Sequence, residues 1–137
     1  MTPVDDLAGW LTQVWDEQEE LALWAAGWDR SGSTRASGRW VRYGVSSIEG
    51  DERQSVIYDD RGQVSRYDAD FIAANDPASV LARVAADRQI LARCMKVLSL
   101  PASAWEYSDA PDLAEATIRD LAQPYADREG FREEWRA

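Results

Sequence analysis

Carboxylates are the side chains of this sequence with the clearest potential for chemistry. Asp16 and Glu20 lie four residues apart, so on a helix both would face the same side, where their oxygen atoms could hold a divalent cation. Metal sites in helical proteins combine acids from several helices, commonly with histidine, and the sequence contains no histidine. The spacing therefore favours a solvated acidic helix face over a metal site.

Nucleophilic and acid-base catalysis find little support in the residue types. Cys94 is the single cysteine, has no histidine to activate it and lies among apolar residues at helical spacing, so we expect it in the core. Acids such as Asp59 and Glu133 stand in polar turn or tail segments, without a neighbouring feature that would shift a pKa. We predict no catalytic, cofactor-binding or metal-binding residue.

The segment from Asp29 to Gly38 is small, polar and contains Arg30 and Arg35. Backbone N–H groups near glycine, together with arginines, suit a phosphate. The spacing nevertheless differs from that of phosphate-loop and dinucleotide-binding motifs. We therefore predict an exposed, flexible loop over residues 27–39.

Net charge limits the classes of partner. The 137 residues carry a formal charge of −10, with six acids and no base in residues 1–27 and nine acids against four arginines in residues 101–137. Proteins that bind nucleic acid or anionic membranes neutralise phosphates with lysine and arginine, so we predict neither direct nucleic-acid binding nor membrane binding. A single cysteine, no apolar run of transmembrane length and no signal-like N-terminus predict a cytoplasmic protein. The length suits one domain over residues 1–137.

A long helix over residues 76–98 is the central predicted element. Asp76 can cap its first turn, and Pro77 fits the first helical position. Apolar residues recur at steps of three and four as far as Leu98, and Pro101 prevents continuation.

The remaining patterns predict an α+β fold. A helical period runs from Thr2 to about Ala26, ahead of Gly27. Alternating runs at 39–45, 55–58 and 63–67 predict an antiparallel three-stranded β-meander, with a hairpin turn at 59–62. Asp68 is expected to cap a short helix, and Asp112 to open another that Pro124 closes. The predicted architecture is an N-terminal helix, the meander, a long central helix that covers the sheet, and C-terminal helices.

Aromatic residues supply the candidate contacts with a partner. Trp105 and Tyr107 fall in a polar loop after Pro101, and Phe131 and Trp135 lie one helical turn apart in the tail 124–137. The tail either docks both rings on the body or presents them to a partner. With the acidic pair of the first helix, the candidate partner-binding residues are Trp105, Tyr107, Phe131, Trp135, Asp16 and Glu20.

Three sequence blocks are distinctive: Asp5-Asp6-Leu7 with Trp10-Leu11, the run IAANDPASVL at residues 72–81 continued by residues 88–91, and LAQPYADREGFREEW at residues 121–135. In these blocks the chain resembles a family of small uncharacterised proteins of actinobacteria and their phages, with an NDPAxVL central helix and a PYADxxGFREEW tail. Many members carry histidines near the position of Asn75 and an insertion with cysteine and histidine. This chain has no histidine, so no metal or redox role is carried over. The resemblance implies a cytoplasmic accessory protein without an established activity.

Three functional hypotheses follow. The preferred one is a non-catalytic protein-binding accessory or regulatory protein that occupies a site on a partner. The alternative is an acidic mimic of DNA that inhibits a nucleic-acid-binding host or defence protein, because the acids concentrate at both ends of the chain. The second alternative is a small enzyme that uses carboxylates. The sequence leaves the oligomeric state open.

Overall fold

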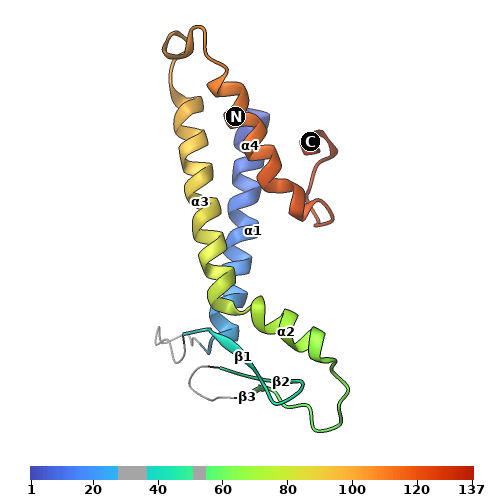
Figure 1. Ribbon diagram of the computed structural model, residues 1–137. Helices are drawn as coiled ribbons and strands as arrows, with labels where there is room; N and C mark the ends of the chain where they lie inside the picture. Colours follow the sequence, from blue (N-terminus) through green and yellow to red (C-terminus); the bar gives the residue numbers. More distant parts are fainter. Residues whose placement is uncertain (28–36, 51–54) are drawn as a thin grey trace. The chain divides into compact units, whose positions relative to one another are not determined.

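The computed structural model describes residues 1–27, 37–50 and 55–137 and confirms the α+β class (Figure 1). The predicted loop 27–39 and its anion-binding alternative fall largely on residues 28–36, outside the described residues. Among the described residues, no helix is long and apolar enough to cross a membrane. The elements in chain order are α1 (Pro3–Ala25), β1 (Trp40–Tyr43), β2 (Ser47–Gly50), β3 (Ser55–Ile57), α2 (Arg66–Ala74), α3 (Pro77–Ser99), the short 3₁₀ helix η1 (Ala102–Trp105), α4 (Ala110–Ala122), and the 3₁₀ helices η2 (Gln123–Tyr125) and η3 (Glu133–Trp135).

The chain divides into two compact units. Unit 1 contains residues 1–16 and 85–137, and unit 2 contains residues 17–84. Both boundaries fall inside long helices, so α1 and α3 each contribute residues to both units. The single domain expected from chain length stays a prediction.

Unit 1 is helical and is built on a capped first turn. The hydroxyl of Thr2 accepts the backbone N–H of Asp5 at 3.2 Å, while Oδ2 of Asp5 accepts the backbone N–H and the hydroxyl of Thr2, each at 2.8 Å. This reciprocal cap satisfies N–H groups that the helix leaves without partners. Within unit 1, the first part of α1 lies beside α3 and α4 (Figure 1), and residues of all three helices line one pocket. The buried residues of unit 1 include Leu7, Leu11, Val14, Trp15, Leu91, Cys94, Ala114, Ile118 and Ala122.

Unit 2 holds a three-stranded antiparallel sheet in the order β1-β2-β3. The predicted strands at 39–45 and 55–58 contain β1 and β3, but the strand predicted at 63–67 is wrong and β2 was not foreseen. The carboxylate of Asp59 accepts the N–H groups of Gln63 and Val64 at 3.0 and 2.9 Å, which fixes that segment as a turn. Ser65 then caps α2 by accepting the N–H of Asp68 at 3.0 Å. The cap of α2 is therefore Ser65, and not Asp68 as predicted.

Helix α2, and not α3 as predicted, packs against β1 and β2. Ile48 of β2 and Ala69 of α2 are fully buried, and the Nε–H of Arg42 on β1 donates to the carboxylate of Asp70 on α2. Helix α2 is the next element after β3 in the chain, and consecutive elements usually lie next to each other. The small side chain of Ala69 leaves room for the strands at this contact.

Asp76 caps α3 as predicted, and it also connects that helix to β1. Its two carboxylate oxygens accept the N–H of Ser79 at 2.8 Å and the N–H of Trp40 at 3.0 Å. Burial opposes ionisation of this carboxyl, but the two N–H donors prevail and hold its pKa below the ordinary value. Gly38 lies against the same helix start, where an added Cβ would come within 3.0 Å of the Pro77 side chain.

Candidate protein-binding surfaces

The segment that joins α3 to α4 is anchored by Trp105. The indole N–H of Trp105 donates to the backbone oxygen of Val97, near the end of α3, at 3.1 Å. Two turns add backbone hydrogen bonds, from Ala104 to Pro101 at 2.9 Å and from Ser108 to the oxygen of Trp105 at 2.8 Å. Trp105 is only half-buried. It therefore holds the segment in place more than it offers a surface of its own.

Tyr107 occupies the most exposed position of this segment. Its side chain is fully exposed, with a relative accessibility of 100%, and its backbone has φ 69°, in the left-handed region. A residue with a Cβ adopts that region at a cost of about 1–2 kcal/mol. Among the described residues, it is the one non-glycine residue with positive φ. The anchored loop therefore carries an aromatic ring that gains nothing from burial within this chain.

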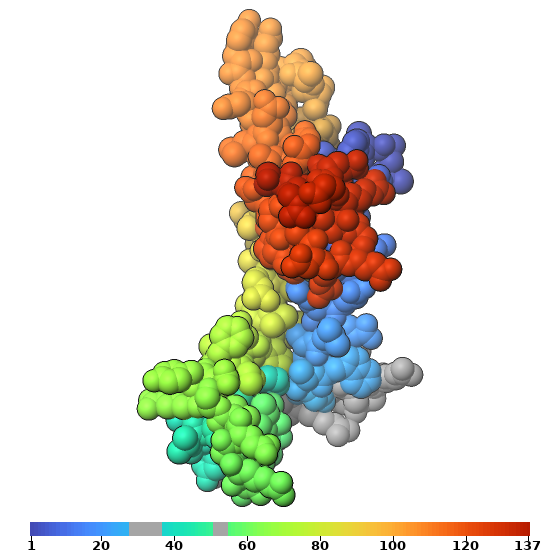
Figure 2. Space-filling model, turned by 90° about the vertical axis from the view of Figure 1, so that its right-hand side faces the viewer, coloured from blue at the N-terminus to red at the C-terminus, as the bar shows by residue number. Residues whose placement is uncertain are grey.

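Further apolar and acidic side chains surround this position in sequence. Leu100 and Leu113 are 43% and 69% exposed. Residues 97–118 contain four acids, Glu106, Asp109, Asp112 and Glu115, and no base. We call residues 97–118 the acidic end of unit 1. Figures 1 and 2 both show its connecting segment, in orange, extending beyond the first residues of α1.

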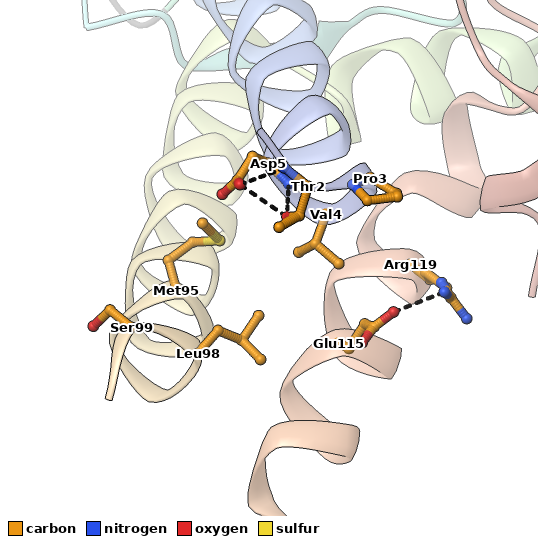
Figure 3. A pocket seen from close by; sticks show the side chains of 9 residues that line it. All are labelled: Thr2, Pro3, Val4, Asp5, Met95, Leu98, Ser99, Glu115 and Arg119. Atoms are coloured by element: carbon orange, nitrogen blue, oxygen red, sulfur yellow. Dashed lines mark hydrogen bonds and ion pairs between the residues drawn. The ribbon is translucent and has the colours of Figure 1, made fainter. Parts of the chain in front are cut away.

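A pocket of about 460 Å³ opens in unit 1 between the start of α1, the end of α3 and α4 (Figure 3). Val4, Met95 and Leu98 form its apolar walls, and Glu115 and Arg119 of α4 form an ion pair at its side, with nitrogen and oxygen 2.8 Å apart. Its complete lining is Thr2, Pro3, Val4, Asp5, Met95, Leu98, Ser99, Glu115 and Arg119. The volume lies within the range of small-molecule and side-chain binding sites.

The tail aromatics lie inside unit 1. Trp135 is only 3% exposed, and its ring centroid lies 5.4 Å from that of Trp10 and 5.9 Å from that of Phe131. Phe131 meets Trp10 edge-on at 5.7 Å. An ion pair between Arg132 and Asp6, at 3.0 Å, adds a polar contact between tail and α1. In the described structure, Trp135 is thus packed in the body and not presented on the surface.

Gly130 allows the tail to approach α1 closely. Its φ is 86°, and an added Cβ would lie 2.8 Å from Nε1 of Trp10, closer than such atoms approach in folded proteins. That indole N–H donates to the backbone oxygen of Glu129 at 3.4 Å. The glycine therefore supplies both the left-handed backbone and the space that the indole needs.

Asp16 and Glu20, the acidic pair of α1, have different surroundings. A guanidinium nitrogen of Arg88 lies 2.6 Å from the carboxylate of Asp16, which explains the basic residue within the apolar stripe of α3. Glu20 is exposed. Among the described residues, no group of three or more histidine, cysteine or acidic side chains is arranged to hold a metal ion.

The groups with perturbed acidity have structural explanations. Burial raises the pKa of the Cys94 thiol, which favours its protonated, less nucleophilic form. The pKa of Asp59 is lowered by the hydroxyl of Ser46 and then by the backbone N–H groups of its turn. Neither of these two groups lines the pocket, whereas Asp5, whose pKa is lowered by the backbone N–H and hydroxyl of Thr2, does.

Sequence reasoning missed several residues of these surfaces. Val4, Met95 and Leu98 follow the apolar helical spacing of α1 and α3, which predicts core packing, so their position in the pocket wall was not foreseen. The absence of any base between Lys96 and Arg119 was a signal available in the sequence. Outside these surfaces, Tyr67 and Phe71 on α2 of unit 2 are 82% and 70% exposed, and the predictions did not include them.

Comparison with known proteins yields one family. A family model described as a family of unknown function, DUF6221, matches residues 4–137. No curated protein and no solved structure matches the chain.

Proposed function

We propose that this chain, which belongs to the family of unknown function DUF6221, is a non-catalytic accessory protein that acts by occupying a site on a partner protein. Its location would be the cytoplasm of an actinobacterium, with the gene carried by the bacterium or by one of its phages. The family itself supplies no activity. The proposal therefore depends on the surfaces of the chain.

The observation that carries the proposal is Tyr107. Its ring is fully exposed on a backbone with positive φ, and burial of a large apolar side chain is worth about 1.5–3 kcal/mol. A partner that covers the ring gains this free energy without ordering the loop, because Trp105 already fixes it through the 3.1 Å hydrogen bond to Val97. Tyrosine is also among the residues that dominate binding energy at protein interfaces.

The other candidate residues have subordinate roles in this proposal. Trp105 positions the loop, while Phe131 and Trp135 hold the tail through their contacts with Trp10. Asp16 and Glu20 contribute charge at the rim of a complex, where such groups affect the rate of association more than affinity.

Two observations favour binding over the alternatives. Among the described residues, arginines pair with the carboxylates of Asp6, Asp16, Asp70, Glu115, Glu133 and Glu134, so arginine neutralises part of the acidic surface that a DNA mimic would have to present. The raised pKa and burial of the one thiol give no support to nucleophilic catalysis.

Photo-crosslinking tests the proposal. Tyr107 is replaced by p-benzoylphenylalanine, the protein is irradiated in an actinobacterial lysate after nuclease treatment, and adducts are identified by mass spectrometry. The control carries the same replacement at Tyr67, which is 82% exposed in unit 2.

We expect one discrete protein adduct at position 107 that is absent or much weaker at position 67. Equal, diffuse labelling from both positions would contradict the proposal, because it would show that exposure alone accounts for the adducts.

A further inference from the structure

We infer that the acidic end of unit 1, together with the adjoining pocket, binds a basic amphipathic segment of a protein partner, with an apolar side chain of that segment inserted in the pocket. This inference rests on the proposed protein-binding function and names the chemistry of the partner.

The pocket supplies a site for an apolar anchor. Its volume of about 460 Å³ exceeds that of one aliphatic or aromatic side chain, and its walls come from three helices of the same unit (Figure 3). Val4 and Leu98 line it with Met95, whose flexible thioether adapts to different side chains. An inserted side chain would therefore meet apolar atoms from α1 and α3.

Exposed apolar residues extend the possible contact beyond the pocket. Leu100 follows α3 and Tyr107 lies in the connecting segment. Leu113 lies about 160° around α4 from the pocket-lining Glu115 and is therefore outside this surface. A segment with several apolar residues on one face can cover such positions, whereas a small molecule confined to the pocket would leave them exposed.

Charge decides which kind of segment fits. The acidic end has four acids and no base, and among the residues that the structure describes, Glu115 is the one of the four with an ion-pair partner, Arg119. Within the described part of the chain, Glu106, Asp109 and Asp112 make no side-chain ion pair or hydrogen bond. These three carboxylates would attract lysine and arginine residues that flank the apolar anchor, and they would repel an acidic segment.

The test compares two fluorescein-labelled helical peptides of equal length with the same leucine face. One carries lysine on its polar face and the other carries glutamate. Binding to the full chain is measured by fluorescence anisotropy at low and moderate salt. A third titration uses the small apolar dye 1-anilinonaphthalene-8-sulfonate.

We expect the lysine peptide to bind at least tenfold more tightly than the glutamate peptide, and to weaken as salt rises. The triple variant Glu106→Gln/Asp109→Asn/Asp112→Asn should weaken its binding by about tenfold, because three exposed ion pairs would be lost. Leu98→Ser, in the wall of the pocket, should weaken binding, while the control Leu21→Ser should not, since Leu21 is 67% exposed in unit 2.

Several results would overturn the inference. The first is equal affinity for the lysine and glutamate peptides, and the second is an unchanged affinity of the triple variant for the lysine peptide. The third is an equal effect of the two leucine variants on that affinity, and the fourth is binding of the dye without binding of either peptide. Circular dichroism of each variant verifies that the fold is retained. If the lysine peptide fails while crosslinking at position 107 still captures one protein, protein binding stands and the basic partner chemistry is rejected.

Discussion

Replacing Gly130 by alanine tests how the tail is held on unit 1. Gly130 has φ 86°, and an added Cβ would lie 2.8 Å from Nε1 and 3.3 Å from Cδ1 of Trp10. The left-handed backbone costs alanine about 1–2 kcal/mol. The indole must also move, which weakens its contacts with Phe131 and Trp135 and costs roughly another 1–2 kcal/mol.

Gly62 provides a matched control. It also has positive φ, 63°, but an added Cβ would meet no atom within 4 Å. Gly62→Ala therefore isolates the cost of the backbone conformation. The difference between the two variants measures the cost of displacing Trp10.

The assay is urea unfolding followed by circular dichroism, with thermal melts in parallel. We expect Gly130→Ala to lower the free energy of unfolding by about 2–4 kcal/mol, against about 1–2 kcal/mol for Gly62→Ala. For a chain of this length each kcal/mol corresponds to a fall of about 4 °C in Tm. Equal losses in the two variants would refute the close contact between tail and α1.

Two further predictions concern groups with shifted pKa values. Asp76→Ala should lower the free energy of unfolding at pH 7 by about 1–3 kcal/mol, because the N–H groups of Ser79 and Trp40 lose their acceptor. The folded pKa of Asp76 lies below its ordinary value of 3.8, so its contribution to the free energy of unfolding is complete well above that value and is lost as pH falls through the folded pKa. Urea unfolding at pH 7 and pH 2.5 should therefore show a smaller difference in unfolding free energy between wild type and Asp76→Ala at the lower pH. A difference that stays constant would contradict the lowered pKa of Asp76. Cys94 is buried with a raised pKa, so a disulfide exchange reagent should label it slowly in the native protein and rapidly in urea, and rapid native labelling would contradict its burial.

The long helices were predictable because their signals are local. Asp76 and Pro77 mark the start of α3 within two adjacent residues, and apolar spacing carries the helix to its end at Ser99. Strand β2 was not predictable in this way, because in Ser47–Gly50 only Ile48 is strongly apolar. Its strand geometry depends on pairing with residues on both sides in the sheet.

The two aromatic residues of the connecting loop show that local sequence signals could not predict the candidate site either. Trp105 and Tyr107 have similar sequence surroundings, but only Trp105 finds an acceptor, the oxygen of Val97 at the end of α3. Trp135 is buried because Trp10, far away in the sequence, lies beside it. Such long-range contacts decide which aromatic ring stays exposed, and sequence periodicity does not contain them.

The most direct test of protein binding is a titration calorimetry measurement with the protein captured at position 107. Wild type, Tyr107→Ser and Tyr67→Ser are each titrated with the purified partner. We predict that Tyr107→Ser raises Kd by about 30-fold or more, equivalent to about 2 kcal/mol, while Tyr67→Ser leaves Kd unchanged. An unchanged Kd in Tyr107→Ser would contradict the account.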